Sequence, residues 1–113
     1  MLDDRYDKMT ELRAAEDLLI SLQESRIATE TEIGFTMERI QELKAFLAAT
    51  EAEAVKIIDG FSYDTRIWNF LRLKYILGYS WVDIAFQTKI PEATVKVAVY
   101  RAFQKTTSAE HQS

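Results

Sequence analysis

Residues 78–103, GYSWVDIAFQTKIPEATVKVAVYRAF, predict two short helices joined by a tight turn. Gly78 is suited to end a preceding helix, and Ser80 with Asp83 three residues later matches the S-x-x-D pattern of a capping box. Pro91 fits the first turn of the next helix, where its missing N–H costs no hydrogen bond. The stretch therefore predicts a helix over residues 81–88 and a second one starting near Pro91, which together form a helix-turn-helix.

The second helix of this pair is expected to have one buried and one exposed face. With Val95 at the centre of the buried face, 3.6 residues per turn place three apolar residues beside it: Val99, Ala102 and Phe103. The residues on the opposite, outward face are Ala93, Val97, Tyr100 and Gln104, with Lys96 and Arg101 on its two flanks.

A third helix is predicted just upstream, over residues 63–77. Gly60 is expected to end the preceding helical run, and residues 62–64 supply side chains that cap helix starts. Apolar residues of this segment alternate with basic ones, namely Arg66, Arg72 and Lys74. Residues 61–106 therefore form a predicted three-helix module, followed by a polar, flexible tail over residues 107–113.

The first half of the chain carries an apolar stripe at helical spacing on an otherwise charged background. The stripe consists of Leu12, Leu19, Leu22, Ile33, Met37, Ile40, Leu43 and Leu47. Such a seam is typical of a coiled coil or a helical hairpin, because one isolated helix cannot bury it. Either the chain's own second helix or a second copy of the chain can cover it, and we favour a homodimer over an intramolecular packing.

The overall prediction is an all-α protein with a long N-terminal helix or helical hairpin of coiled-coil type over residues 1–60. The helix-turn-helix module follows it. Residues 25–34 have weak helix propensity, with several Ser and Thr residues and Gly34, so they are either a hinge or part of one continuous helix.

Charge is distributed unevenly along the chain, whose net charge is −4. Residues 1–60 hold 7 Lys and Arg against 14 Asp and Glu, whereas residues 61–113 hold 7 against 4. An acidic half that nucleic acid would repel is thus joined to a basic half that it would attract.

Several classes of function are disfavoured by the composition. The chain has no cysteine, its single His111 lies in a polar tail, and no glycine-rich phosphate loop, catalytic triad signature or calcium-loop spacing is present. No apolar run is long enough for a membrane span, and the first residues do not resemble a signal peptide. We therefore expect a cytoplasmic protein that is not an enzyme and uses no metal or cofactor.

The helix-turn-helix region resembles the fourth region of sigma factors, the part that binds the promoter −35 element. The resemblance covers residues 71–102 and is carried by LRLKY at 71–75, GYSW at 78–81, DIA at 83–85, TVK at 94–96 and Arg101-Ala102. With a long helical segment before it in so short a chain, the sequence is similar to small phage late-gene regulators of the RinA and ArpU type. The resemblance implies a phage or prophage transcription regulator in the cytoplasm of a bacterial host. Pro91 departs from the family, which commonly has Ser or Thr at that point.

The predicted partner is double-stranded DNA. Lys96 can donate to guanine, while Ala93 and Val97 can contact thymine methyl groups in the major groove. The predicted DNA-binding residues are Ser80, Trp81, Lys89, Glu92, Ala93, Thr94, Lys96, Val97, Tyr100, Arg101 and Lys105. In the alternative, the outward face is an apolar patch for a protein such as host RNA polymerase or another nucleic-acid enzyme. Binding that weakens steeply with salt would favour DNA.

Overall fold

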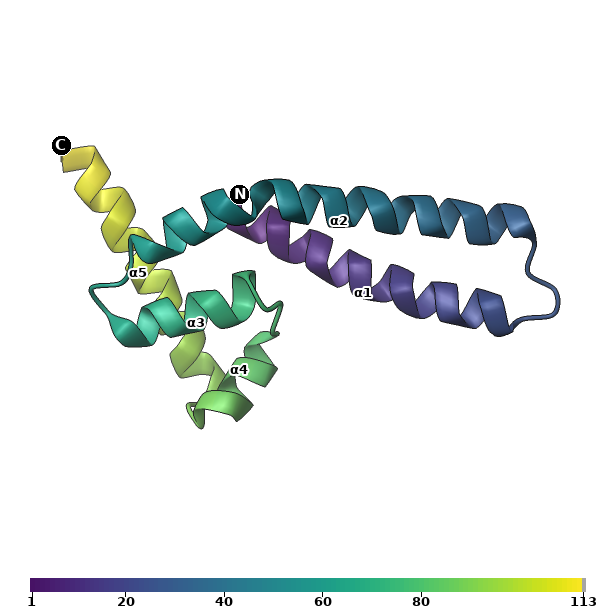
Figure 1. Ribbon diagram of the computed structural model, residues 1–113. Helices are drawn as coiled ribbons and strands as arrows, with labels where there is room; N and C mark the ends of the chain where they lie inside the picture. The colour runs from purple at the N-terminus through teal and green to yellow at the C-terminus, as the bar shows by residue number, and fades with distance from the viewer. Residues whose placement is uncertain (113) are drawn as a thin grey trace. The chain divides into compact units, whose positions relative to one another are not determined.

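The computed structural model describes the backbone of residues 1–112 and the side chains of residues 1–105. Within that part there are five helices and no strand, which confirms the predicted all-α fold (Figure 1). The helices are α1 (Leu2–Glu24), α2 (Glu30–Asp59), α3 (Thr65–Tyr75), α4 (Trp81–Thr88) and α5 (Glu92–Gln112). They form two compact units, Met1–Ala52 and Glu53–Ser113.

The first unit is a hairpin of two antiparallel helices, α1 and the greater part of α2 (Figure 1). The helical path is interrupted over residues 25–29, so the segment is a hinge, one of the two alternatives that the sequence allows for residues 25–34. Thr29 caps the start of α2 by accepting a hydrogen bond from the Glu32 N–H at 3.2 Å. Gly34, in contrast, lies inside α2.

Polar contacts join the two helices of the hairpin at the end away from their connecting turn and near the middle of their shared length. The buried Arg5 donates from Nη1 to the Leu47 carbonyl oxygen at 2.7 Å and to the Thr50 hydroxyl at 2.8 Å. Further along, the Arg39 guanidinium donates two hydrogen bonds to the Glu11 carboxylate, of 2.8 and 2.9 Å. A guanidinium that faces both oxygens of a carboxylate attracts it and also restricts the relative position of the two helices along their axes.

The hairpin covers part of the predicted apolar stripe within one chain. Ile40 and Leu43 are buried, whereas Met37 remains 49% exposed. The other stripe residues, Leu12, Leu19, Leu22, Ile33 and Leu47, are half-buried. The chain's own second helix therefore covers the centre of the seam, and its coverage by a second copy stays a prediction.

The second unit is a three-helix module to which the end of α2 also belongs. Ala54 and Ile58, near the end of α2, have no exposed surface, which explains why the division lies at Ala52 and Glu53 and not at the predicted position after residue 60. The remaining core of this unit consists of Phe61, Ile67, Phe70, Leu71, Tyr75, Ile84, Val95, Val99 and Ala102. The indole N–H of Trp68 on α3 donates to the Asp59 carboxylate at 3.0 Å, at the last residue of α2.

The helix ends follow the signals in the sequence. The Asp64 carboxylate caps the start of α3 by accepting hydrogen bonds from the Arg66 and Ile67 N–H groups, at 3.0 and 3.3 Å. α3 ends at Tyr75, two residues before the predicted end at residue 77, and Gly78 follows it with a left-handed φ of 75°. The capping box of Ser80 and Asp83 is confirmed, with reciprocal hydrogen bonds of 3.1 and 3.3 Å. Gly60 directly follows α2, but the left-handed φ usual for a glycine there is absent.

No helix in the described part of the chain is long and apolar enough to cross a membrane. His111 and the tail expected to be flexible, residues 107–113, lie outside the residues whose side chains are described.

Candidate nucleic-acid interface

The outward face of α5 is the face that the sequence predicts. Val95 has no exposed surface, and Val99 and Ala102 are buried beside it. Phe103 is half-buried. The predicted outward residues Ala93, Val97, Tyr100 and Gln104 are all exposed. Since Val97 is 46% and Tyr100 is 64% exposed, α5 offers apolar as well as polar groups to an incoming partner.

Packed aromatic rings support α5 from behind. Phe61, in the turn after α2, meets Phe103 of α5 edge to face, with ring centres 5.4 Å apart. This is the geometry that aromatic pairs favour, because the positive edge of one ring faces the negative surface of the other. The buried Lys74 of α3 places its ammonium 4.2 Å from the centre of the Trp81 ring at the start of α4. These contacts hold the inner side of α5 against the turn after α2, and the start of α4 against α3.

One edge of the outward face carries a cation that is already paired. The Lys96 ammonium lies 2.8 Å from the Glu92 carboxylate, one helical turn earlier. Both side chains are about half exposed, so solvent screens this pair and it contributes little to stability. Lys96 can thus exchange Glu92 for a DNA group, but its charge is partly neutralised beforehand.

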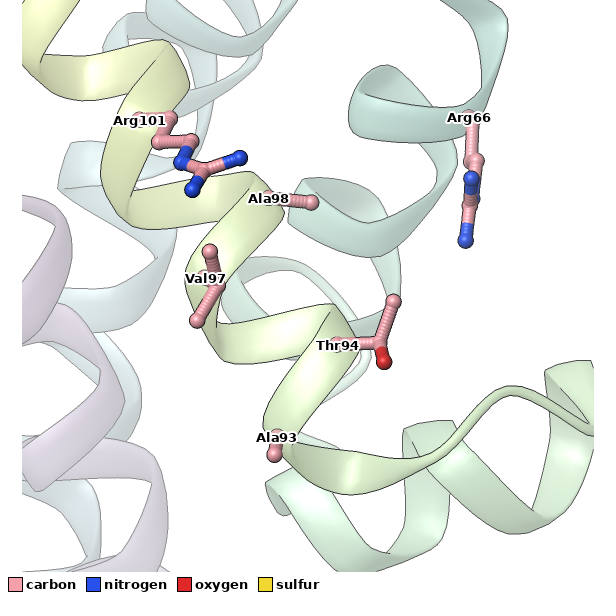
Figure 2. A pocket seen from close by; sticks show the side chains of 6 residues that line it. All are labelled: Arg66, Ala93, Thr94, Val97, Ala98 and Arg101. Carbon is pink, nitrogen blue, oxygen red and sulfur yellow. The ribbon is translucent and has the colours of Figure 1, made fainter.

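The other edge borders a groove between α5 and α3, with a volume of about 440 Å³. Figure 2 shows Arg66 on the α3 side and Arg101 on the α5 side of it. Its lining residues are Arg66, Ala93, Thr94, Val97, Ala98 and Arg101. Arg66 is absent from the residues predicted for DNA binding, because only the packing of α3 against α5 brings it to this face. The basic character of α3 was the one sequence signal that pointed to it.

The remaining predicted site residues fall into two groups. Ser80 and Trp81 are committed to the fold: the first caps α4, and the second is half-buried against Lys74. Lys89 and Lys105 are exposed, Lys89 in the turn between α4 and α5 and Lys105 on α5. The predicted set is therefore brought together on α5 and its preceding turn, while the start of α4 serves mainly to hold that arrangement.

A second exposed surface lies on α4. Phe86 is 83% exposed and Val82, one turn earlier, is 62% exposed. Large apolar side chains spaced by one turn line one side of a helix. Residues of this kind gathered on a surface are characteristic of sites for protein partners.

Comparison of the chain with protein-family models, with curated proteins and with solved structures finds no match. The features described above therefore carry the functional argument.

Proposed function

We propose that this protein is a double-stranded DNA-binding transcription regulator of the phage or prophage type, which acts as a dimer. The observation that carries the proposal is the outward face of α5. It is exposed, flanked by Lys96 and Arg101, and held by a core on its other side. A helix of this kind, preceded by a short helix and a turn, is suited to enter the major groove.

The chemistry of the face supports sequence-specific contacts. Ala93 and Val97 are small enough to approach base edges and can pack against thymine methyl groups, and Lys96 can donate to guanine. A basic module with a narrow outward helix face suits the major groove of DNA better than it suits a small-molecule ligand. Among the described residues there is also no group of three His, Cys, Asp or Glu side chains that could hold a metal ion.

The test is selection of bound duplexes from a random pool, followed by titration of the selected duplex. Lys96→Ala should weaken binding by about 1–3 kcal/mol and relax the sequence preference at one position, because it removes a donor to a base. Arg26→Ala, the same loss of one positive charge at an exposed position between α1 and α2, is the matched control. Failure of the wild-type chain to enrich any duplex would refute the proposal.

A second candidate function is binding of a protein partner such as host RNA polymerase. The exposed Phe86 and Val82 on α4 favour it, because DNA contacts alone give no reason for a large apolar side chain there. A complex formed through these residues should tolerate salt, whereas DNA binding should weaken steeply as salt rises. A pull-down from host lysate with and without nuclease, using wild type and Phe86→Ser, separates the two functions.

A further inference from the structure

Arg66 and Arg101 are two exposed cations that have no ion-pair partner among the side chains of residues 1–105. The Arg66 guanidinium lies 5.7 Å from the centre of the Phe70 ring, a contact that orients the side chain without cancelling its charge. An anion can therefore bind both arginines without breaking an existing pair, in contrast to Lys96, which is held by Glu92.

The wall between the two arginines is built to let a backbone come close. Ala93 and Ala98 line the groove with methyl groups, and the Thr94 hydroxyl adds a hydrogen-bond donor (Figure 2). A volume of about 440 Å³ is many times the roughly 30 Å³ that one water occupies in the liquid. The groove thus has room for a phosphodiester group together with ordered water.

The positive N-terminal end of α3 does not attract an anion to this groove. The Asp64 carboxylate accepts hydrogen bonds from the Arg66 and Ile67 N–H groups and places a negative charge at that end. Attraction of an anion must therefore come from the guanidinium groups. Planar guanidinium groups are well suited to this, because they can give two parallel hydrogen bonds to the oxygens of a phosphate.

We infer that Arg66 and Arg101 form a clamp for one phosphodiester of the DNA backbone. The inference rests on the proposed DNA-binding function and deepens it in two ways. It adds a contact from α3, outside the helix-turn-helix pair, and it assigns the Arg101 edge of α5 to the sugar-phosphate backbone. Phosphate contacts of this kind fix the orientation of a recognition helix without reading sequence.

The test is binding of the full chain to its selected duplex over a salt series, measured by fluorescence anisotropy. Arg66→Ala and Arg101→Ala should each weaken binding about tenfold at low salt and reduce the slope of log K against log salt by about 0.9. Because both side chains hold the same phosphate, the double variant should lose little more than either single variant. Arg66→Lys and Arg101→Lys should keep the slope but bind less tightly, since lysine lacks the planar fork.

Arg26→Ala, the same substitution at an exposed position between α1 and α2 in the first unit, is the control and should bind as wild type does. If Arg66→Ala behaves like this control while the wild type binds DNA, the clamp is wrong and the proposed function stands. A double variant whose losses are fully additive indicates two independent contacts, and this also overturns the clamp. If the wild type selects no duplex, both ideas fail. Thermal melts verify that each variant is folded, with Arg66→Gln replacing Arg66→Ala if the latter unfolds.

Discussion

At the scale of single residues, the turn between α4 and α5 contains a backbone conformation that its side chain does not favour. Lys89 has φ 58° and ψ 32°, in the left-handed region, where residues other than glycine incur about 1–2 kcal/mol of steric strain. It is the only residue besides glycine with positive φ in the described part of the chain. Glycine would adopt this backbone conformation without the steric strain, since it has no Cβ.

This strain leads to a prediction at Lys89. Lys89→Gly should stabilise the protein by about 0.5–1 kcal/mol. Glycine makes the unfolded chain more flexible, which raises the entropy lost on folding, but relief of the backbone strain is the larger of the two effects. Lys89→Ala keeps the strained φ and should bring no such gain, as urea melts of both variants can establish. If the side chain also touches DNA, both variants should bind the selected duplex more weakly and to the same extent. Equal stability of the glycine and alanine variants would contradict the argument.

At the scale of helices, the capping box at the start of α4 is the best-defined local device in the module. Ser80→Ala should reduce stability by about 0.5–2 kcal/mol, the usual loss for a capping side chain. Changing both Ser80 and Asp83 to alanine should cost less than the sum of the single changes, because their two hydrogen bonds form one unit. Ser62→Ala, in the turn before α3, is a matched control. Full additivity in urea melts would show that the two hydrogen bonds act separately.

The hairpin has its own sensitivity to pH through the pair that joins α1 to α2. Hydrogen bonding to Arg39 holds the pKa of the Glu11 carboxyl below its ordinary value of 4.5. A lowered folded-state pKa stabilises the protein above the ordinary value, and this contribution is lost as the pH falls through the folded-state pKa. Helicity of the wild type under mild denaturation should therefore fall more steeply below about pH 4.5 than that of Glu11→Gln. Arg39→Gln removes the same pair and should flatten the profile likewise; a profile as steep as wild type in either variant would exclude this pair as the cause.

The sequence was most informative where short-range chemistry decides the structure. Gly78, Ser80 and Asp83 define the boundary between α3 and α4 within a few residues, and the 3.6-residue period assigns the faces of α5 correctly. It was least informative where distant segments meet. The position of Arg66 beside α5, and the burial of the end of α2 in the second unit, depend on tertiary packing that no local pattern encodes. The pairing of Lys96 with Glu92 is a one-turn spacing that could have been anticipated.

For the whole molecule, the division into two units preserves the separation of charge. Residues 1–52 hold 6 Lys and Arg against 12 Asp and Glu, whereas residues 53–113 hold 8 against 6. An acidic hairpin is repelled by DNA, so the proposed DNA binding would rely on the second unit, whose net charge is only +2. A module with so few excess cations binds weakly by itself, because phosphate neutralisation supplies much of the affinity of DNA-binding proteins. Two linked modules would gain affinity from their high local concentration.

The hairpin offers a surface through which such a dimer can form, and this gives the last prediction. A groove of about 250 Å³ lies between α1 and α2, and on its lining Ile20 is 55% and Met37 is 49% exposed. A two-helix unit of this size buries little apolar surface by itself, so covering this surface should stabilise it. Light scattering at micromolar concentration should give a dimer for wild type and for Ala49→Glu, an exposed position outside the groove. Met37→Glu should give a monomer that binds DNA more weakly and protects one half-site in place of two, whereas a monomeric wild type would refute the dimer.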